Sequence, residues 1–361
     1  MLSTTHLKRF IETMAILSRI PLLAGVLGLA LACNFAAATP YTPNHGAQEI
    51  ASWTVSAVPT HAVSLDELRD AIAQGQYPGQ ADTQFGRVKA QLLSMITRTP
   101  SDPETWYLYA RVLQHQHQFD LALEALDRAI ALKPSDANAF LLKASIHMIQ
   151  GDTQAAKQAC MAMLGQAAML TVSACALEAA SHDGNLVSSY RELKRLSQLS
   201  PPEDEQQALW IAQILADMAM RQARPDEALS YFSQVELARA PVSLLALWAD
   251  ILLANHRPDE VLTRLTPIVN AHSVQDDALL LRLAIAEKSY PPLTHWQTSF
   301  AQRVALRELR QDSAHAADLA RYYLDVNVQP DKALFWAEIN WHVARLSVDR
   351  ALLERAQTQV Q

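Results

Sequence analysis

Apolar residues recur at helical spacing along most of the chain, and one stretch repeats that spacing almost position by position. Between Pro103 and Leu164, two copies of a helix-turn-helix pattern follow each other at an offset of 34 residues. Trp106 of the first copy corresponds to Phe140 of the second, and Ala110 corresponds to Ala144. Apolar and small residues at intervals of three and four are typical of amphipathic helices that pack closely. The pattern therefore predicts antiparallel helix pairs stacked into an array.

Weaker forms of this periodicity predict helices on the N-terminal side of the repeat. Ser64 and Glu67 have the spacing of a capping box, which predicts a helix that ends near Gly75. A second apolar stripe predicts a helix from Phe85 to Thr97. We interpret residues 64–102 as a divergent helical cap, because the end units of a repeat array are usually atypical.

A recurring six-residue motif predicts helix starts on the C-terminal side. The segment 224–229 (RPDEAL) recurs as 257–262 (RPDEVL), and a related segment occupies 329–334 (QPDKAL). Each motif places Pro in the first turn of a helix and an acidic residue near the positive end of the helix dipole. Apolar spacing predicts further helices at Asp276–Lys288, Trp296–Arg310 and Ala314–Asp325, and a terminal capping helix at Trp341–Gln357. Together, the motifs and these helices extend the predicted array over residues 103–361.

The first 38 residues resemble an export signal. A positive region is followed by an apolar core from Ile20 to Leu31 and by three alanines that predict cleavage before Thr39. A start at Met14 would give a shorter signal. Cys33 follows a segment that partly resembles a bacterial lipobox, so a lipoprotein anchored at Cys33 and an uncleaved anchor are alternatives. Residues 39–63 have no sustained period and predict an extended or disordered lead-in.

Composition narrows the possible partners. The chain has 361 residues, 50% of them apolar and 19% charged, which is ample for a sizeable core. Residues 1–38 carry three positive charges and one negative charge, so their removal changes the formal charge from −7 to −9. A body this acidic argues against nucleic acid as a partner, and it limits membrane contact to an N-terminal anchor or lipid.

Two cysteines remain once the signal is removed, and an even pair in an exported protein suggests a disulfide. Cys160 falls on the second helix of one repeat and Cys175 on the first helix of the next, and such helices pack directly. We predict that they are bonded; the alternative is two buried free thiols that fill space in the core.

Motifs of catalysis are missing from the sequence. It contains no G-x-S-x-G, H-E-x-x-H, Walker or C-x-x-C motif, and paired acidic residues stand where helix starts favour them. We assign no catalytic residue, cofactor or metal ligand. One alternative is a metal-handling protein or enzyme that uses His115 and His117, with Asp120 nearby.

The repeats at 103–164 resemble the tetratricopeptide repeat, and the chain is similar to exported tetratricopeptide proteins of Gram-negative bacteria. The resemblance implies an all-α, right-handed superhelical solenoid that acts as an adaptor. Its first helices would expose inward-facing positions that suit a protein or peptide, although the Lys/Asn clamp for acidic C-termini is missing. The other interpretation is a solvated face with no dedicated ligand. The predicted protein-binding residues are Tyr107, Arg111, His115, Leu141, Ser145 and Met148.

The sequence thus predicts a non-enzymatic, protein-binding scaffold or adaptor of the bacterial cell envelope, in the periplasm or otherwise exported. Its binding partner would be another protein or peptide.

Overall fold

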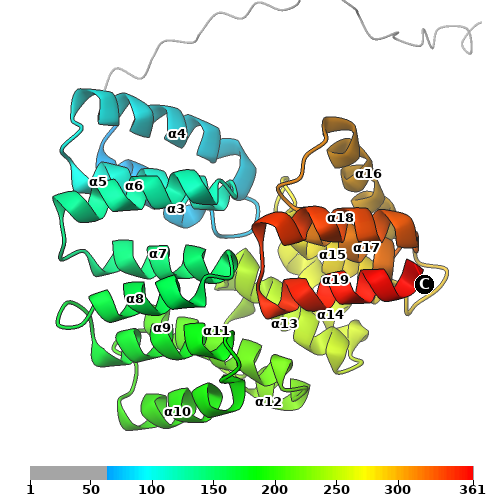
Figure 1. Cartoon of the computed structure of the whole chain (residues 1–361). Helices are drawn as coiled ribbons and strands as arrows, with labels where there is room; N and C mark the ends of the chain where they lie inside the picture. The colour runs from blue at the N-terminus through cyan, green and yellow to red at the C-terminus, as the bar shows by residue number, and fades with distance from the viewer. Residues whose placement is uncertain (1–62, 361) are drawn as a thin grey trace, which may run out of the picture. The chain divides into compact units, whose positions relative to one another are not determined.

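The computed structural model describes residues 63–360, apart from the side chains of residues 81–84. Within this range the chain folds into α-helices and turns and contains no strand. Figure 1 shows the helices arranged as successive antiparallel pairs. The predicted signal peptide at 1–38, the cysteine at position 33 and nearly all of the predicted lead-in at 39–63 lie outside the described residues.

The N-terminal helices follow the predicted pairing. Their bounds are α3, Leu65–Gln74; α4, Ala81–Arg98; α5, Pro103–His115; α6, Phe119–Leu132; α7, Ala137–Ile149; α8, Thr153–Ala162; α9, Met169–Ser181; α10, Leu186–Leu199; α11, Glu205–Arg221; and α12, Pro225–Ser230. The capping box predicted at Ser64 and Glu67 is formed. Helix α4 begins four residues before the predicted Phe85, because its first turn carries no apolar stripe that could reveal it.

The C-terminal helices begin after a short 3-10 turn at Leu237–Arg239. They are α13, Val242–Ala254; α14, Pro258–Asn270; α15, Asp277–Glu287; α16, His295–Arg310; α17, Ala316–Asp325; α18, Pro330–Val343; and α19, Ser347–Val360. The three repeated motifs start α12, α14 and α18, each with Pro in the first turn.

The prediction of one terminal helix from Trp341 to Gln357 is wrong at its start. Trp341 belongs to α18, and the chain turns before α19 begins at Ser347. Asp349 holds this turn, because its carboxylate accepts hydrogen bonds from the Asn340 side chain at 2.7 Å and from the Leu346 backbone N–H at 3.0 Å. A contact of this kind leaves no trace in apolar periodicity.

The odd-numbered helices from α5 to α19 form a continuous layer. Each contacts the next odd-numbered helix as well as its own neighbours in the chain. Small residues where neighbouring helices meet are fully buried, among them Ala110 and Ala144, which correspond in the two repeats, and Ala122 and Ala156. Trp106, at the position that corresponds to Phe140, is only partly buried and donates its indole N–H to the carbonyl of Pro100 at 2.9 Å. The described residues form an all-α, tetratricopeptide-like solenoid.

The solenoid also closes on itself within the described residues. The turn after α3 meets the start of α13, where the Val242 N–H donates to the Gln76 carbonyl at 2.8 Å. The turn between α18 and α19 meets the end of α7, where the Arg345 N–H donates to the Ile149 carbonyl at 2.6 Å. Gly151 allows this approach, since a Cβ there would lie 3.0 Å from the Cβ of Arg345 and its φ is +82°.

Cys160 and Cys175 lie on α8 and α9, both fully buried, as expected of facing helices. Their Cα atoms are 5.6 Å apart, within the range that a disulfide needs, and their sulfur atoms are at bonding distance. The geometry permits the predicted disulfide, whose formation in the protein stays a prediction.

A network of buried charges joins α13, α15 and α17. Arg282 on α15 contacts Asp250 at 2.8 Å and Asp318 at 3.0 Å, and Arg321 contacts Asp250 at 2.8 Å. Burial by itself would raise the pKa of Asp250, but Arg282 and Arg321 hold it at about 2. The three inner helices are therefore held together by charge pairing as well as by apolar contact.

The disulfide yields a first prediction. Replacement of both cysteines, Cys160→Ser with Cys175→Ser, is expected to lower the free energy of unfolding by about 3 kcal/mol, because the bond closes a short loop in the unfolded chain. Urea unfolding measures this loss, and thiol labelling of the unfolded, unreduced protein is expected to find both sulfurs blocked. Equal labelling with and without prior reduction would show that the bond does not form.

The charge network around Arg282 yields a second prediction. Asp250→Ala is expected to cost about 3–5 kcal/mol of stability, because it leaves buried Arg282 undercompensated. Since the pKa of Asp250 is lowered in the folded state, its contribution is present above the unfolded pKa of about 4 and is lost as pH falls toward 2. Unfolding curves at several pH values test this. Glu236→Ala, at an exposed pair with Arg239, is the control and should change little.

Candidate functional site

The inner layer of helices lines an open cavity of about 650 Å³. Its walls come from α5, α7, α9, α11 and α13, and Leu346, Ser347 and Val348 at the start of α19 line it as well. Successive first helices thus contribute to one hollow, and the closing turn before α19 covers part of it. This is the arrangement expected of a groove in which a solenoid holds a ligand.

Five of the six predicted binding residues line this cavity. Tyr107 and Arg111 reach it from α5, and Leu141, Ser145 and Met148 reach it from α7. All are half-buried except Met148, which is buried. The structure brings these residues together, but whether they bind a protein stays a prediction.

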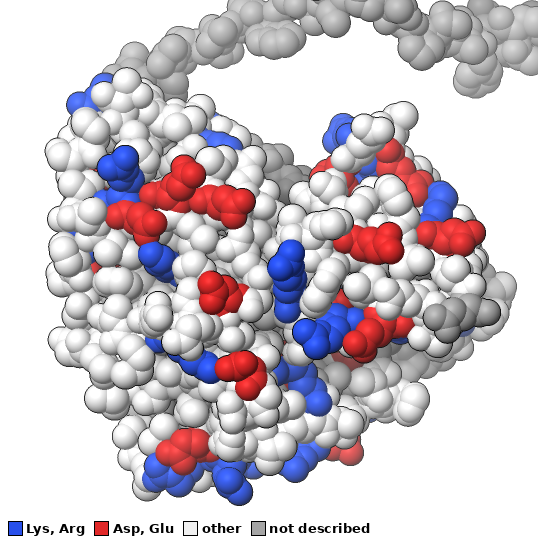
Figure 2. Space-filling view, in the orientation of Figure 1, with Lys and Arg blue, Asp and Glu red and all other residues white. Residues whose placement is uncertain are grey.

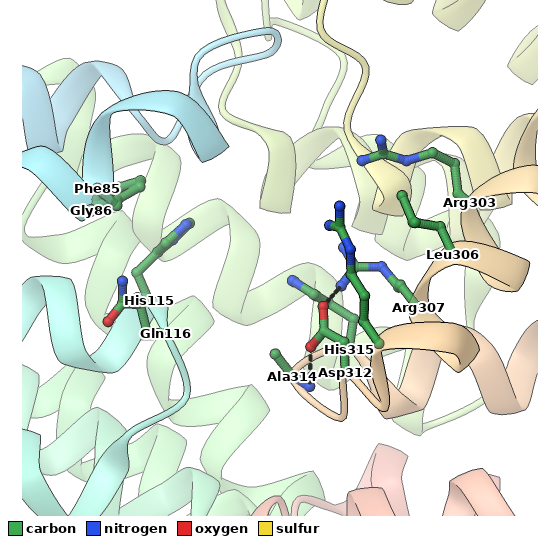
Figure 3. Close-up of a pocket in the computed structure, with 11 residues that line it drawn as sticks. Phe85, Gly86, His115, Gln116, Arg303, Leu306, Arg307, Asp312, Ala314 and His315 are labelled. Carbon is green, nitrogen blue, oxygen red and sulfur yellow. Dashed lines mark hydrogen bonds and ion pairs between the residues drawn. The ribbon is translucent and has the colours of Figure 1, made fainter. Parts of the chain in front are cut away.

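His115, the sixth, lines other hollows. Its ring stacks on Phe85 with centroids 3.9 Å apart and planes inclined by 23°. It lines a second cavity of about 480 Å³ with residues of α4, of α16 and of the turn between α16 and α17, shown in Figure 3. There Arg307 bonds to Asp277 at 2.5 Å and to Asp312 at 2.6 Å. Because these charges already pair with one another, this second cavity is a weaker candidate for a ligand than the first.

The sequence did not predict that α9 and α11 line the cavity of about 650 Å³, which we call the main cavity. The part that they contribute includes Glu178, His182, Trp210 and Asp217. Counted along α11, the position of Arg111 corresponds to Gln213, which lines the cavity, but the position of Tyr107 corresponds to Leu209, which does not. The repeat motif is too weak there to fix the start of the helix from sequence.

Ionisable groups gather in that part of the cavity. Arg221 pairs with Asp217 at 2.8 Å and donates to the hydroxyl of Ser181 at 2.6 Å and to its carbonyl at 3.2 Å. Burial raises the pKa of Asp217. Burial, with the Arg221 charge beside it, lowers the pKa of His182 to about 4, so this imidazole is neutral at pH 7.

Glu178 differs from its neighbours, because its carboxyl group has no hydrogen bond to any residue in the part of the chain that the structure describes. Burial and the nearby charge of Asp217 raise its pKa to about 8, although Arg221 acts in the opposite direction. At pH 7 its carboxyl group is therefore mostly protonated.

Apolar side chains complete the cavity. Leu141 lines it from α7, Trp210 and Ile214 from α11, and Leu247 from α13. Burial raises the pKa of Tyr107, whose hydroxyl therefore stays protonated and able to donate a hydrogen bond at neutral pH. The cavity combines apolar surface with a few polar groups, the mixture common in binding sites.

The alternative metal site at His115 and His117 gains no third ligand. His117 lies against His315, with ring centroids 5.3 Å apart, and burial followed by the charges of His315 and His115 lowers its pKa to about 4. Among residues 63–360, no group of three or more His, Cys, Asp or Glu side chains is placed to hold a metal ion. No helix in the same range is long and apolar enough to cross a membrane.

Charge on the surface is mixed. On the face in Figure 2, acidic and basic side chains are interspersed among uncharged ones. The exclusion of nucleic acid as a partner rests on net charge alone and stays a prediction.

Comparison with known proteins identifies the repeat. Residues 103–146 match the sequence model of the tetratricopeptide repeat, and no curated protein matches the chain. Similar solved structures include PilW, a widely conserved type IV pilus biogenesis factor, at 16% identity and a TM-score of 0.40 over 64% of this chain and 96% of PilW. The Cut9–Hcn1 hetero-tetramer of the APC/C is similar at 13% identity and a TM-score of 0.45, over 81% of this chain and 48% of that one. Human IFIT1 bound to m7Gppp-AAAA is similar at 11% identity and a TM-score of 0.48, over 82% of this chain and 71% of IFIT1.

The chain spans about half the length of the Cut9–Hcn1 chain that it matches. Identities this low concern the helical fold alone, and none of these structures indicates what this protein binds. The matched residues 103–146 cover α5, α6 and most of α7, the helices that carry Tyr107, Arg111, Leu141 and Ser145. Residues 103–146 thus match the tetratricopeptide repeat, and the described helix pairs stack in the manner of such repeats.

Proposed function

We propose that this protein is a non-enzymatic scaffold or adaptor of the bacterial cell envelope that binds a segment of another protein in its main cavity. The observation that carries this proposal is the common position of Tyr107, Arg111, Leu141, Ser145 and Met148 on one inner surface. Aromatic and Arg side chains in partly desolvated pockets commonly supply most of the energy of a protein interface.

The cavity suits an extended or helical segment better than a whole folded surface. It is about 650 Å³ in volume and is lined by both apolar walls and hydrogen-bonding groups. Repeat proteins of this kind typically hold partners along the concave layer of first helices. The closing turn at Leu346–Val348 forms part of the same cavity, so a bound segment would contact both ends of the array.

Placement in the envelope rests on sequence features. The apolar N-terminal segment before Thr39 has the form of an export signal. The cysteine pair at Cys160 and Cys175 fits an oxidising compartment, where disulfides persist. The periplasm satisfies both features.

Binding in the cavity gives a third prediction. A Tyr107→Ala/Arg111→Ala variant is expected to retain at least about tenfold less partner from envelope extracts than the wild type, because the loss of two anchors commonly costs 2 kcal/mol or more. Arg128→Ala is the matched control, since Arg128 is exposed on α6 and lines none of the described cavities. Quantitative mass spectrometry of the captured proteins measures the effect. Equal capture by both variants and wild type would place the binding site elsewhere.

The N-terminus gives a fourth prediction. Cleavage after residue 38 would leave Thr39 as the first residue, and the intact mass of protein purified from the native envelope is expected to match that start. A mass that matches a chain starting at Cys33 with added acyl groups would show that the protein is a lipoprotein and not a soluble exported protein. A mass that retains residues 1–38 would contradict cleavage altogether.

A further inference from the structure

Two acidic side chains of the main cavity lie near a single basic one. Glu178 on α9 and Asp217 on α11 are two carboxyl groups close enough to influence each other, and Arg221 is the cation beside them. The guanidinium of Arg221 already bonds to Asp217 and, through its other nitrogens, to Ser181. Each of its three nitrogens therefore already has a contact, and the carboxyl group of Glu178 is left without a hydrogen-bonding partner among the described residues.

Other ionisable groups around the cavity do not fill this role. His182 approaches Arg221 and the Ser347 hydroxyl, at 3.5 and 3.3 Å, and is neutral at pH 7 because its pKa is lowered to about 4. Arg111 reaches the cavity from α5, where it acts on the hydroxyl of Tyr107. The closing turn contributes Leu346, Ser347 and Val348, which carry no charge.

Glu178 is half-buried, and a carboxyl group with little water and no hydrogen-bonding partner is costly to ionise; its raised pKa keeps it mostly protonated in the free protein. A ligand that brought a positive charge would remove the need for the proton. Apolar surface lies within the same cavity, including Trp210 and Leu141. Such surface can pack the aliphatic stem of Lys or Arg, and an indole face attracts a cation.

We propose that the bound protein segment inserts a Lys or Arg side chain into the cavity, where Glu178, beside Asp217, holds its cationic head. This inference rests on the proposed function and adds the chemistry of the partner. It predicts the opposite preference from a clamp for acidic C-termini. It also predicts that binding ionises Glu178 and releases its proton.

The test begins with peptides rather than an extract. A phage library of random ten-residue peptides is selected on the folded full-length protein, and each selected peptide is measured by fluorescence anisotropy against wild type and a Ser145→Trp variant. The added indole would fill part of the cavity. Ser94→Trp, at an exposed position on α4, is the matched control. Peptides that bind in the cavity are expected to be enriched in Lys or Arg, and to lose at least tenfold in affinity with Ser145→Trp alone.

A double-mutant cycle then tests the contact. Glu178→Gln keeps the shape of the side chain and removes its charge, and the matching peptide carries Gln in place of its Lys or Arg. Each single change is expected to weaken binding about tenfold or more, and the second change is expected to cost little once the first is made. Circular dichroism confirms that the variants fold. Independent, additive effects, or none from Glu178→Gln, would overturn the inference.

Calorimetry supplies a separate readout. The selected peptide is titrated at pH 7 in two buffers of different ionisation enthalpy, which reveals how many protons binding releases. Wild type is expected to release up to one proton, and Glu178→Gln is expected to lack that release. Equal proton release by both proteins would contradict the proposed contact.

The outcomes separate the two proposals. If no selected peptide depends on the open cavity, the cavity is not a binding site, and both the proposed function and this inference fail. If peptides need the open cavity but show neither a basic residue nor coupling to Glu178, binding in the cavity stands and the inference about charge fails.

Discussion

Close packing of small residues between neighbouring helices is the constraint on which the structure depends. Ala110, Ala122, Ala144 and Ala156 are fully buried, and larger side chains at these places would separate the helices. A single helix pair cannot cover its own apolar face, so each pair depends on the next. The same packing fixes the odd-numbered helices side by side, and so determines which side chains share the inner surface.

Closure of the solenoid gives that inner surface its binding character. Contacts from Gln76 to Val242 and from Ile149 to Arg345 join segments far apart in the sequence. They bring the start of α19 to the cavity lined by α5, α7, α9 and α11. Polar groups enclosed there lose water, which explains why the pKa of Glu178 is raised and that of His182 is lowered. Closure contacts at the edge of the cavity thus help to set its electrostatics.

Local signals predicted the helices well where their cause is local. The capping box at Ser64 and the proline motifs that start α12, α14 and α18 act within one helical turn, and the repeat period placed Tyr107 and Arg111 on the inner surface. Individual side-chain contacts could not be predicted in this way. The turn held by Asp349, the stacking of His115 on Phe85 and the approach of Glu178 to Asp217 leave no trace in apolar periodicity.

The central claim is that the cavity formed by the inner helices receives a segment of another protein. Site-specific photo-crosslinking in living cells tests it most directly, with a benzophenone amino acid placed at Leu141 in the cavity or at exposed Leu121 on α6. The account predicts a discrete crosslinked partner from position 141 that is missing from position 121. Adducts from position 121 alone, or the same adducts from both positions, would contradict it.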